Sequence, residues 1–199
     1  MAGFSSPEIS QAKLFVKLVI ASTGASGAIY LQRLLDQINC TQHEVHLVLS
    51  AFGKQVIHDE LGELRIPSGV EEHNDRTMNV PFASGSTYYD AMVIVPCTMG
   101  TLGRIAGGIS DSLISRAADV FLKERRKLIL VPRETPWNLI HIRSAQTLLE
   151  AGAIIMPASP AFYSRPASME ELADTIVHRI LDLLGLPAPK AFRWFENPE

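Results

Sequence analysis

The sequence is poor in cysteine, with only Cys40 and Cys97 among its 199 residues. The two lie far apart and lack the spacing of a metal-ligand pair or a disulfide framework, so we expect reduced thiols in a cytoplasmic protein. Long apolar runs are absent as well, since none approaches the roughly 18–20 residues that cross a bilayer. Residues 1–12 have no hydrophobic segment of the kind found in signal peptides, and we expect them to form a disordered lead-in.

An excess of one charge is also missing. The 18 lysines and arginines nearly balance the 21 aspartates and glutamates, which gives a net charge of -3. Nucleic acids and anionic membranes favour proteins with a basic surface, so neither is an expected partner. The sequence also lacks the H-E-x-x-H spacing of metal sites, the G-x-S-x-G of hydrolases, the G-x-G-x-x-G motif and a Walker loop. It therefore predicts neither a metal site nor a hydrolase triad.

Short apolar segments alternate regularly with helical patterns. Strands are predicted at 18–21, 44–50, 91–95, 128–131 and 153–156, and helices at 28–38, 51–61, 111–125, 137–151 and 168–184. The irregular stretch 61–82 is expected to hold one more short strand, and connections of this length are often functional. The alternation predicts an α/β protein with a three-layer, doubly wound parallel sheet, a flavodoxin-like Rossmann fold. No repeat or linker divides the chain, so residues 1–199 are predicted to form a single domain.

The turn after the first predicted strand is the most distinctive stretch. Residues 22–27 offer two glycines and three hydroxyls between an apolar strand and a helix. Glycine lets the backbone approach an anion closely, and a helix N-terminus favours negative charge. The stretch predicts a phosphate or nucleotide cradle, although a tight turn without a ligand fits the same residues.

Small, hydroxylic or ionic residues also follow the other predicted strands. They are found at Ser50 and at 96–101, 132–134 and 157–163. The carboxyl ends of parallel strands meet at one edge of the sheet, where ligands bind in this class of fold. Five such ends together predict a ligand crevice.

Pro96 is expected to end its strand and to leave two threonines and a glycine at the crevice. Backbone amides and hydroxyls from Thr98 to Thr101 suit a phosphate or the edge of a flavin ring. The same threonines are equally compatible with a simple helix cap. Cys97 is disfavoured as a nucleophile because no histidine or aspartate partner is apparent.

Charged residues near the other predicted strand ends leave two interpretations open. The planar guanidinium of Arg133 is suited to a phosphate or a carboxylate, and Glu134 is either a proton carrier or the ion-pair partner of an arginine. Arg116 and Lys123 are seven residues apart on a predicted helix, so they either reach one anion or form a solvated basic face. Tyr163 either donates its hydroxyl to a phosphate or packs on the surface.

These stretches resemble the UbiX family of flavin prenyltransferases. The matching motifs are T-G-A-S-G at 23–27, V-H-L-V-L-S at 45–50, A-S-G-S at 83–86, P-C-T-M-G-T at 96–101, R-A-A-D-V at 116–120, L-K-E-R-R at 122–126, L-V-P-R-E at 130–134, I-H at 140–141 and A-F-Y at 161–163. They occur in the family's order from about residue 17 to 194, nearly the whole chain. The succession of L-K-E-R-R and L-V-P-R-E is the most specific part of the resemblance.

The resemblance implies a prenyltransferase and not a decarboxylase. Members of the family bind reduced FMN and attach to it the dimethylallyl group of dimethylallyl monophosphate, with no metal. The product, prenylated FMN, is the cofactor of UbiD-type decarboxylases, so a functional link to such an enzyme is implied. Members usually assemble as homododecamers.

The resemblance also assigns roles to residues at matching positions. FMN would be bound by Gly24, Ala25, Ser26, Ser50, Thr98, Met99, Gly100, Thr101 and Arg133. The dimethylallyl phosphate would be held by Arg116, Lys123, Tyr163, Arg179 and Trp194. Catalytic roles would fall to Ser26, Glu60, Lys123 and Glu134. The position of Trp194 implies that the C-terminal tail, 187–199, covers the site.

Two other functions are compatible with a flavin-binding fold. One is a non-catalytic FMN carrier or chaperone that supplies a decarboxylase partner, which would have no use for Lys123, Tyr163 and Arg179 as phosphate ligands. The other is an FMN-dependent peptidyl-cysteine decarboxylase. Such enzymes typically carry P-A-S-A-N-T and P-x-M-N-x-x-M-W, whereas this sequence has P-C-T-M-G-T at 96–101 and lacks the second motif.

Overall fold

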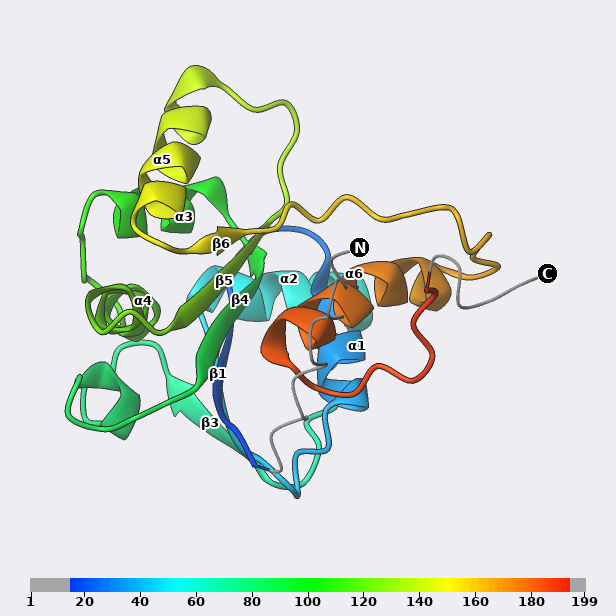
Figure 1. The fold of residues 1–199 in the computed structure, drawn as a ribbon, viewed down its shortest axis with the longest axis horizontal. Coiled ribbons are helices and arrows are strands. Elements are labelled where there is room, and N and C mark those ends of the chain that lie inside the picture. Colours follow the sequence, from blue (N-terminus) through cyan, green and yellow to red (C-terminus); the bar gives the residue numbers. More distant parts are fainter. Residues whose placement is uncertain (1–14, 194–199) are drawn as a thin grey trace, which may run out of the picture.

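The computed structural model describes residues 15–193, which form a sheet with helices on both faces (Figure 1). The strands are β1 (Lys17–Ser22), β2 (Glu44–Leu49), β3 (Val70–Asn74), β4 (Ala91–Cys97), β5 (Lys127–Pro132) and β6 (Ile154–Ile155). The helices are α1 (Ala28–Gln37), α2 (Ala51–Leu61), α3 (Met99–Ala106), α4 (Leu113–Lys123), α5 (Leu139–Glu150) and α6 (Met169–Leu184), with a 3-10 turn, η1, at Pro81–Ala83. None of these helices is long and apolar enough to cross a membrane.

All strand pairs are parallel, in the order β3-β2-β1-β4-β5-β6. This is the Rossmann order, and without the edge strand β3 it reduces to the flavodoxin order. The predicted doubly wound sheet is therefore confirmed. The strand expected within 61–82 is β3.

The buried residues form two layers, one on each face of the sheet. Leu18 and Ile20 of β1 pack with α1, α2 and α6, whereas Val19 and Ala21 pack with α3, α4 and α5. Successive strand residues point to opposite faces, so a strand covered on both faces is apolar throughout. This is why the central strands read as continuous apolar runs.

Pro96 does not end its strand, contrary to the sequence prediction. β4 continues through it to Cys97, and the register with β5 shifts between Ile94 and Cys97. Proline has no backbone N–H to donate, and an irregularity in the ladder is where a strand accepts it. The strand therefore ends at Cys97, two residues later than expected.

The C-terminal tail packs on α6 as far as the structure describes it. Both terminal nitrogens of Arg193 contact the carboxylate of Asp182, each at 2.7 Å, and Ala191 is buried. The proposed lead-in, 1–12, and Trp194 lie outside the described residues.

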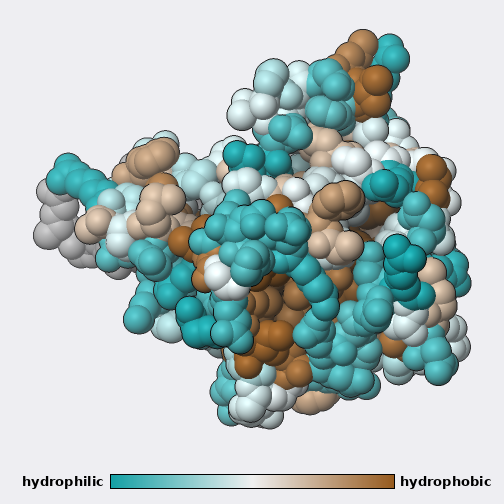
Figure 2. Space-filling model, turned by 180° about the vertical axis from the view of Figure 1, so that it is seen from behind, coloured by the Kyte–Doolittle hydropathy of each residue, from teal (hydrophilic) through white to brown (hydrophobic). Residues whose placement is uncertain are grey.

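Helix α5 stands out from the body of the protein and carries apolar side chains on its surface (Figure 2). Leu139 and Ile140 are 61% and 71% exposed, and Ile142 and Leu149 are also exposed. Several exposed apolar side chains on one helix are a feature of surfaces that contact another protein.

Candidate active site

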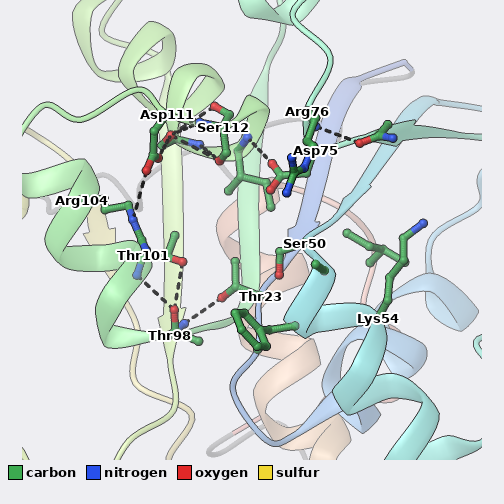
Figure 3. Close-up of a pocket in the computed structure, with 17 residues that line it drawn as sticks. Thr23, Ser50, Lys54, Asp75, Arg76, Thr98, Thr101, Arg104, Asp111 and Ser112 are labelled. Atoms are coloured by element: carbon green, nitrogen blue, oxygen red, sulfur yellow. Dashed lines mark hydrogen bonds and ion pairs between the residues drawn. The ribbon is translucent and has the colours of Figure 1, made fainter.

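A cavity of about 890 Å³ opens at the carboxyl edge of the sheet (Figure 3). It is formed by the ends of β1, β2, β3 and β4 and by the first turns of α2, α3 and α4. Its walls are Thr23, Gly24, Leu49, Ser50, Ala51, Phe52, Lys54, Asn74, Asp75, Arg76, Thr98, Thr101, Arg104, Asp111, Ser112, Ile114 and Ser115. The crevice predicted from the strand ends is therefore present, and Gly24, Ser50, Thr98 and Thr101 line it as expected.

Three helices begin at this cavity. Ser50, Thr98 and Ser112 are their N-cap residues, and each side-chain hydroxyl accepts a hydrogen bond from the amide three residues on, at 2.9, 3.0 and 3.3 Å. The helix-cap interpretation of Thr98 is thus confirmed. The positive ends of three helix dipoles converge on one space, which favours an anion there. No residue in the described part of the chain accepts a hydrogen bond from the amides of Ala51 and Phe52, so these donors are available to a ligand.

Gly24 allows the first turn to lie against the start of α2. A Cβ atom at this position would lie 2.5 Å from the Cβ of Phe52 and 3.3 Å from its carbonyl carbon. Real Cβ atoms do not approach so closely, and the Cβ of Phe52 cannot turn away because it is bonded directly to the backbone. Any side chain at position 24 would therefore separate two walls of the cavity.

Sequence reasoning missed several polar residues of the cavity. Asp75 accepts a hydrogen bond from the amide of Ile114 at 3.0 Å and thereby fixes the start of α4. Burial raises the pKa of Asp75, which the bonds from Ile114 and Ser112 oppose. Arg104 pairs with Asp111 at 3.4 Å. For Asp75, the sequence offered one indication, which was that the long irregular stretch 61–82 is of a kind that is often functional. Its position at the cavity depends on the pairing of β3 with β2, which the sequence alone does not reveal.

A second polar cluster lies at the start of α1. The Glu60 carboxylate accepts hydrogen bonds from the amides of Gly27 and Ala28, at 2.9 and 2.8 Å. Partial burial raises the pKa of Glu60, but hydrogen bonds from Ser26 and from these amides, with the charge of Arg133, outweigh it, so the pKa lies below its usual value. Ser26, Glu60 and Arg133 therefore lie close together.

This cluster corrects the prediction of a phosphate cradle at 22–27. Helix α1 has no side-chain cap of its own, because its N-cap residue is Gly27. Glu60, from the last turn of α2, supplies the missing acceptor. The anion at this helix start is thus a carboxylate of the protein, and the amides without a protein acceptor lie instead at the neighbouring cavity.

Some predicted flavin ligands contribute no side chain to the cavity. Ala25 and Met99 are buried in the core, at 8% and 7% exposure, and Gly100 does not line the cavity. Glu134 is exposed and accepts a hydrogen bond from the amide of Thr135 at 3.0 Å. The structure records no ion pair between Glu134 and an arginine among residues 15–193, so that alternative is not supported.

Arg116 and Lys123 lie along one face of α4, next to residues 83–87. Arg116 donates to the carbonyl of Ala83 at 3.1 Å, and Lys123 pairs with Glu124 beside Gly85. Their predicted common face is confirmed. Lys123 ends the helix that begins at the cavity, and a rise of 1.5 Å per residue puts it about 16 Å from Ser112 along the axis. Neither Arg116 nor Lys123 is among the residues that line the cavity of their own chain.

Tyr163 and Arg179 lie together in a second, smaller cavity. They line a cavity of about 360 Å³ between residues 161–166, α6 and residues 190–193. Arg179 pairs there with Asp182 at 3.1 Å. One chain thus presents the predicted site residues in four places, which are the large cavity, the cluster at the start of α1, the face of α4 and this smaller cavity.

Comparisons with known proteins identify the family of the chain. The model of the Flavoprotein family matches residues 7–185. The probable UbiX-like flavin prenyltransferase of Bacillus subtilis is 44% identical over 184 residues, covering 90% of this chain and 89% of its own. The crystal structure of AnUbiX in complex with FMN and dimethylallyl pyrophosphate matches with a TM-score of 0.84 and 42% identity, covering 90% of this chain and 97% of that one. A dodecameric FMN-dependent UbiX-like decarboxylase from Escherichia coli matches with a TM-score of 0.82 and 39% identity, covering 89% and 98%.

The family model spans most of the sequence, and the identity to these relatives extends over nine-tenths of the chain. The cavity and the Ser26, Glu60 and Arg133 cluster lie within the matched region. The chain therefore belongs to the Flavoprotein family, among the UbiX-type flavin prenyltransferases.

Proposed function

We propose that this protein is a flavin prenyltransferase that joins the dimethylallyl group of dimethylallyl monophosphate to reduced FMN. The observation that carries the proposal is the anion-binding cavity with the Ser26, Glu60 and Arg133 cluster at its side. The resemblance to AnUbiX, whose structure contains FMN and dimethylallyl pyrophosphate, supports it.

The lining of the cavity supports FMN as its ligand. The amides of Ala51 and Phe52, with the hydroxyls of Ser50 and Thr98, suit the phosphate, while Gly24 lets the first turn lie close against these amides. FMN supplies the electron-rich reduced flavin that the prenyl group alkylates. The guanidinium of Arg133 would hold a polar edge of that ring.

Glu60 is the group placed to accept a proton. Each of the two new bonds would form at a flavin position that loses a proton, and the second bond would also require a proton on the prenyl double bond. A carboxylate that stays ionised is suited to accept a proton and return it. Ser26 donates a hydrogen bond to Glu60. Ser26 belongs to the same turn as Gly24, which lines the cavity, so this bond connects the carboxylate to the wall of the cavity. Glu134 remains a candidate for the second proton.

The phosphate of the prenyl donor needs positive charge as it leaves. Arg116, Lys123 and Arg179 supply cations and Tyr163 a hydroxyl, which together would stabilise the developing charge. These residues lie on surfaces apart from the cavity, so we propose that neighbouring copies in a homo-oligomer complete each site. The dodecameric neighbour and the exposed apolar side chains of α5 support a dodecamer of this chain.

The product, prenylated FMN, would serve a UbiD-type decarboxylase in the cytoplasm. Neither nucleic acid nor membrane is a proposed partner. A prenyltransferase differs from a flavin carrier in one measurable respect, which is that it changes the mass of the flavin.

The test is an anaerobic incubation of the protein with reduced FMN and dimethylallyl monophosphate, followed by mass spectrometry of the released flavin. A flavin heavier by one five-carbon prenyl unit is the expected result. A parallel reaction with the diphosphate identifies the preferred donor. FMN that co-purifies but is unchanged with either donor would replace the proposal with a flavin carrier.

A further inference from the structure

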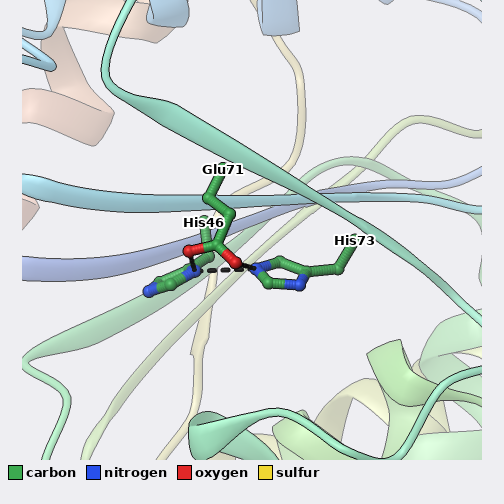
Figure 4. Close-up of side chains that lie close together, drawn as sticks. All are labelled: His46, Glu71 and His73. Carbon is green, nitrogen blue, oxygen red and sulfur yellow. Dashed lines mark hydrogen bonds and ion pairs between the residues drawn. The ribbon is translucent and has the colours of Figure 1, made fainter.

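Two histidines and a glutamate meet at the edge of the sheet, outside the cavity (Figure 4). His46 of β2 lies opposite Glu71 of β3 in the parallel ladder, and His73 follows two residues later on the same face. The Nδ1 atom of His46 lies 2.8 Å from Nε2 of His73. The Glu71 carboxylate lies 3.6 Å from each of these nitrogens.

We propose that His46, Glu71 and His73 bind a divalent transition-metal ion, with Zn²⁺ as the best match. One potential ligand atom from each residue lies within 4.8 Å of the other two. Two imidazoles and one carboxylate form a donor set that zinc uses in open sites, where water takes the fourth position. In such a tetrahedral site the ligand nitrogens are roughly 3.3 Å apart, so the two rings need to separate by about half an ångström.

The surroundings of His46 favour a metal-binding tautomer. Its Nε2 atom lies 3.1 Å from the Glu44 carboxylate and 3.0 Å from the hydroxyl of Tyr89, which itself donates to Glu44 at 2.8 Å. A proton on Nε2 satisfies Glu44 and leaves the lone pair of Nδ1 directed at His73. A carboxylate that holds the far nitrogen of a ligand histidine is the usual support of a metal site.

One side of the site is buried in the protein, and the other side is open to solvent. His46 is 4% exposed, and the ring of Phe82 lies 5.2 and 5.3 Å from the rings of His46 and His73. The Glu71 side chain is 68% exposed, so it can turn onto an ion that enters from solvent. The carboxylates of Glu44 and Glu71 outnumber the nearby ammonium of Lys17, which pairs with Glu44 at 2.7 Å. A cation at this position balances the excess negative charge.

The site is separate from the flavin cavity but adjacent to it along the chain. His73 directly precedes Asn74, which lines the cavity together with Asp75 and Arg76. β3 is the edge strand and pairs only with β2 in the described sheet. An ion shared by the two strands would hold β3 in place and steady that wall of the cavity.

The test uses untagged, full-length protein dialysed against a chelator. Calorimetric titration with Zn²⁺ is expected to give one ion per chain, and Co²⁺ is expected to give the visible absorption of a tetrahedral site. Glu44→Gln should weaken binding by about 10–100-fold because it removes the support of a ligand. His73→Gln should weaken it further, and Glu71→Gln should do so without disturbing the fold because the side chain is exposed.

Glu72→Gln is the matched control. Glu72 lies on the same strand, faces the other way and pairs with Lys54 at 2.7 Å. It should leave Zn²⁺ affinity and the Co²⁺ spectrum unchanged. The proposal is overturned if less than one ion binds per chain, or if Glu71→Gln and His73→Gln bind Zn²⁺ as the native protein does. Since Glu71 is exposed, its variant gives a clear result even if His73→Gln fails to fold.

Discussion

At the scale of single residues, Gly24 determines how closely two walls of the cavity approach. The Cβ of an alanine would lie 2.5 Å from that of Phe52, so Gly24→Ala forces the turn or the start of α2 to move. Overpacking of this kind costs about 1–3 kcal/mol in the free energy of unfolding. We expect Gly24→Ala to lose that much in urea unfolding and to bind FMN more weakly in a fluorescence titration.

Gly103 provides the comparison for this substitution. It lies inside α3, and no atom lies within 4 Å of a Cβ added there. Gly103→Ala should keep FMN affinity and gain up to about 1 kcal/mol of stability, because alanine favours a helix. Equal FMN binding by the two variants would mean that the close approach at Gly24 is unimportant for the flavin.

Glu60 has a structural role and a proposed chemical one, and a conservative change separates them. Glu60→Gln keeps an oxygen acceptor for the amides of Gly27 and Ala28 but cannot take up a proton. We expect the rate of flavin prenylation to fall by about 10²–10⁴-fold, the usual contribution of a general base, while FMN affinity stays close to native. Asp59→Asn, which changes the exposed neighbour, should leave the rate unchanged. An equal rate in Glu60→Gln and native protein would rule out the proton-accepting role.

At the scale of elements, the sequence predicted helices and strands best where local signals agree. The bounds of α2 were predicted correctly because Ser50 is a favourable N-cap and Gly62 ends the helix. The end of β4 was predicted incorrectly at Pro96. A sheet tolerates proline where the strand pairing is irregular, and the irregular pairing of β4 with β5 cannot be inferred from the sequence of β4 alone. Likewise, no local pattern indicates that Glu60 caps α1 from 33 residues away.

The packing of the tail on α6 gives a pH-dependent prediction. The paired hydrogen bonds from Arg193 hold the pKa of Asp182 below its ordinary value, despite partial burial. A lowered pKa in the folded state contributes stability above the unfolded value of about 3.9 and loses it as the pH falls through the folded pKa. Arg193→Gln should therefore lower the free energy of unfolding at pH 7 by about 0.5–1 kcal/mol, since this pair is partly exposed.

The difference should shrink as the pH is lowered below about 4, where Asp182 becomes protonated in the unfolded chain. Urea unfolding of the native protein and of Arg193→Gln, repeated at a series of pH values from 7 downward, measures this difference in the free energy of unfolding. Arg179→Gln serves as the comparison, because Arg179 makes one contact with Asp182 at 3.1 Å and is 65% exposed. Its effect should be smaller at every pH. A constant difference between Arg193→Gln and native protein across the series would exclude the ion pair as its cause.

At the scale of the whole molecule, the distribution of the site residues is the main feature that the sequence could not reveal. The motifs place Glu60, Lys123 and Tyr163 in one family site, but in a single chain they lie in three different places, at the start of α1, at the end of α4 and in the smaller cavity. Distances within one chain cannot be inferred from motif order, and contacts between copies depend on surfaces such as that of α5. The oligomer is thus the level at which the proposed site would become complete.

Mixing inactive variants tests whether copies share a site. Glu60→Gln and Lys123→Ala each remove one proposed component, so each homo-oligomer should be inactive. If a site takes Glu60 from one chain and Lys123 from another, random co-assembly in equal amounts leaves about a quarter of the sites intact, because each position is native with a chance of one half. Co-expressed variants should then recover about a quarter of native flavin prenylation, measured by mass spectrometry. Glu60→Gln mixed with Ser26→Ala is the control, because both changes fall in the cluster of one chain and no mixture restores it. Failure of the first pair to recover activity, with oligomers shown to be mixed, would mean that each chain builds its own site by closing around the substrate.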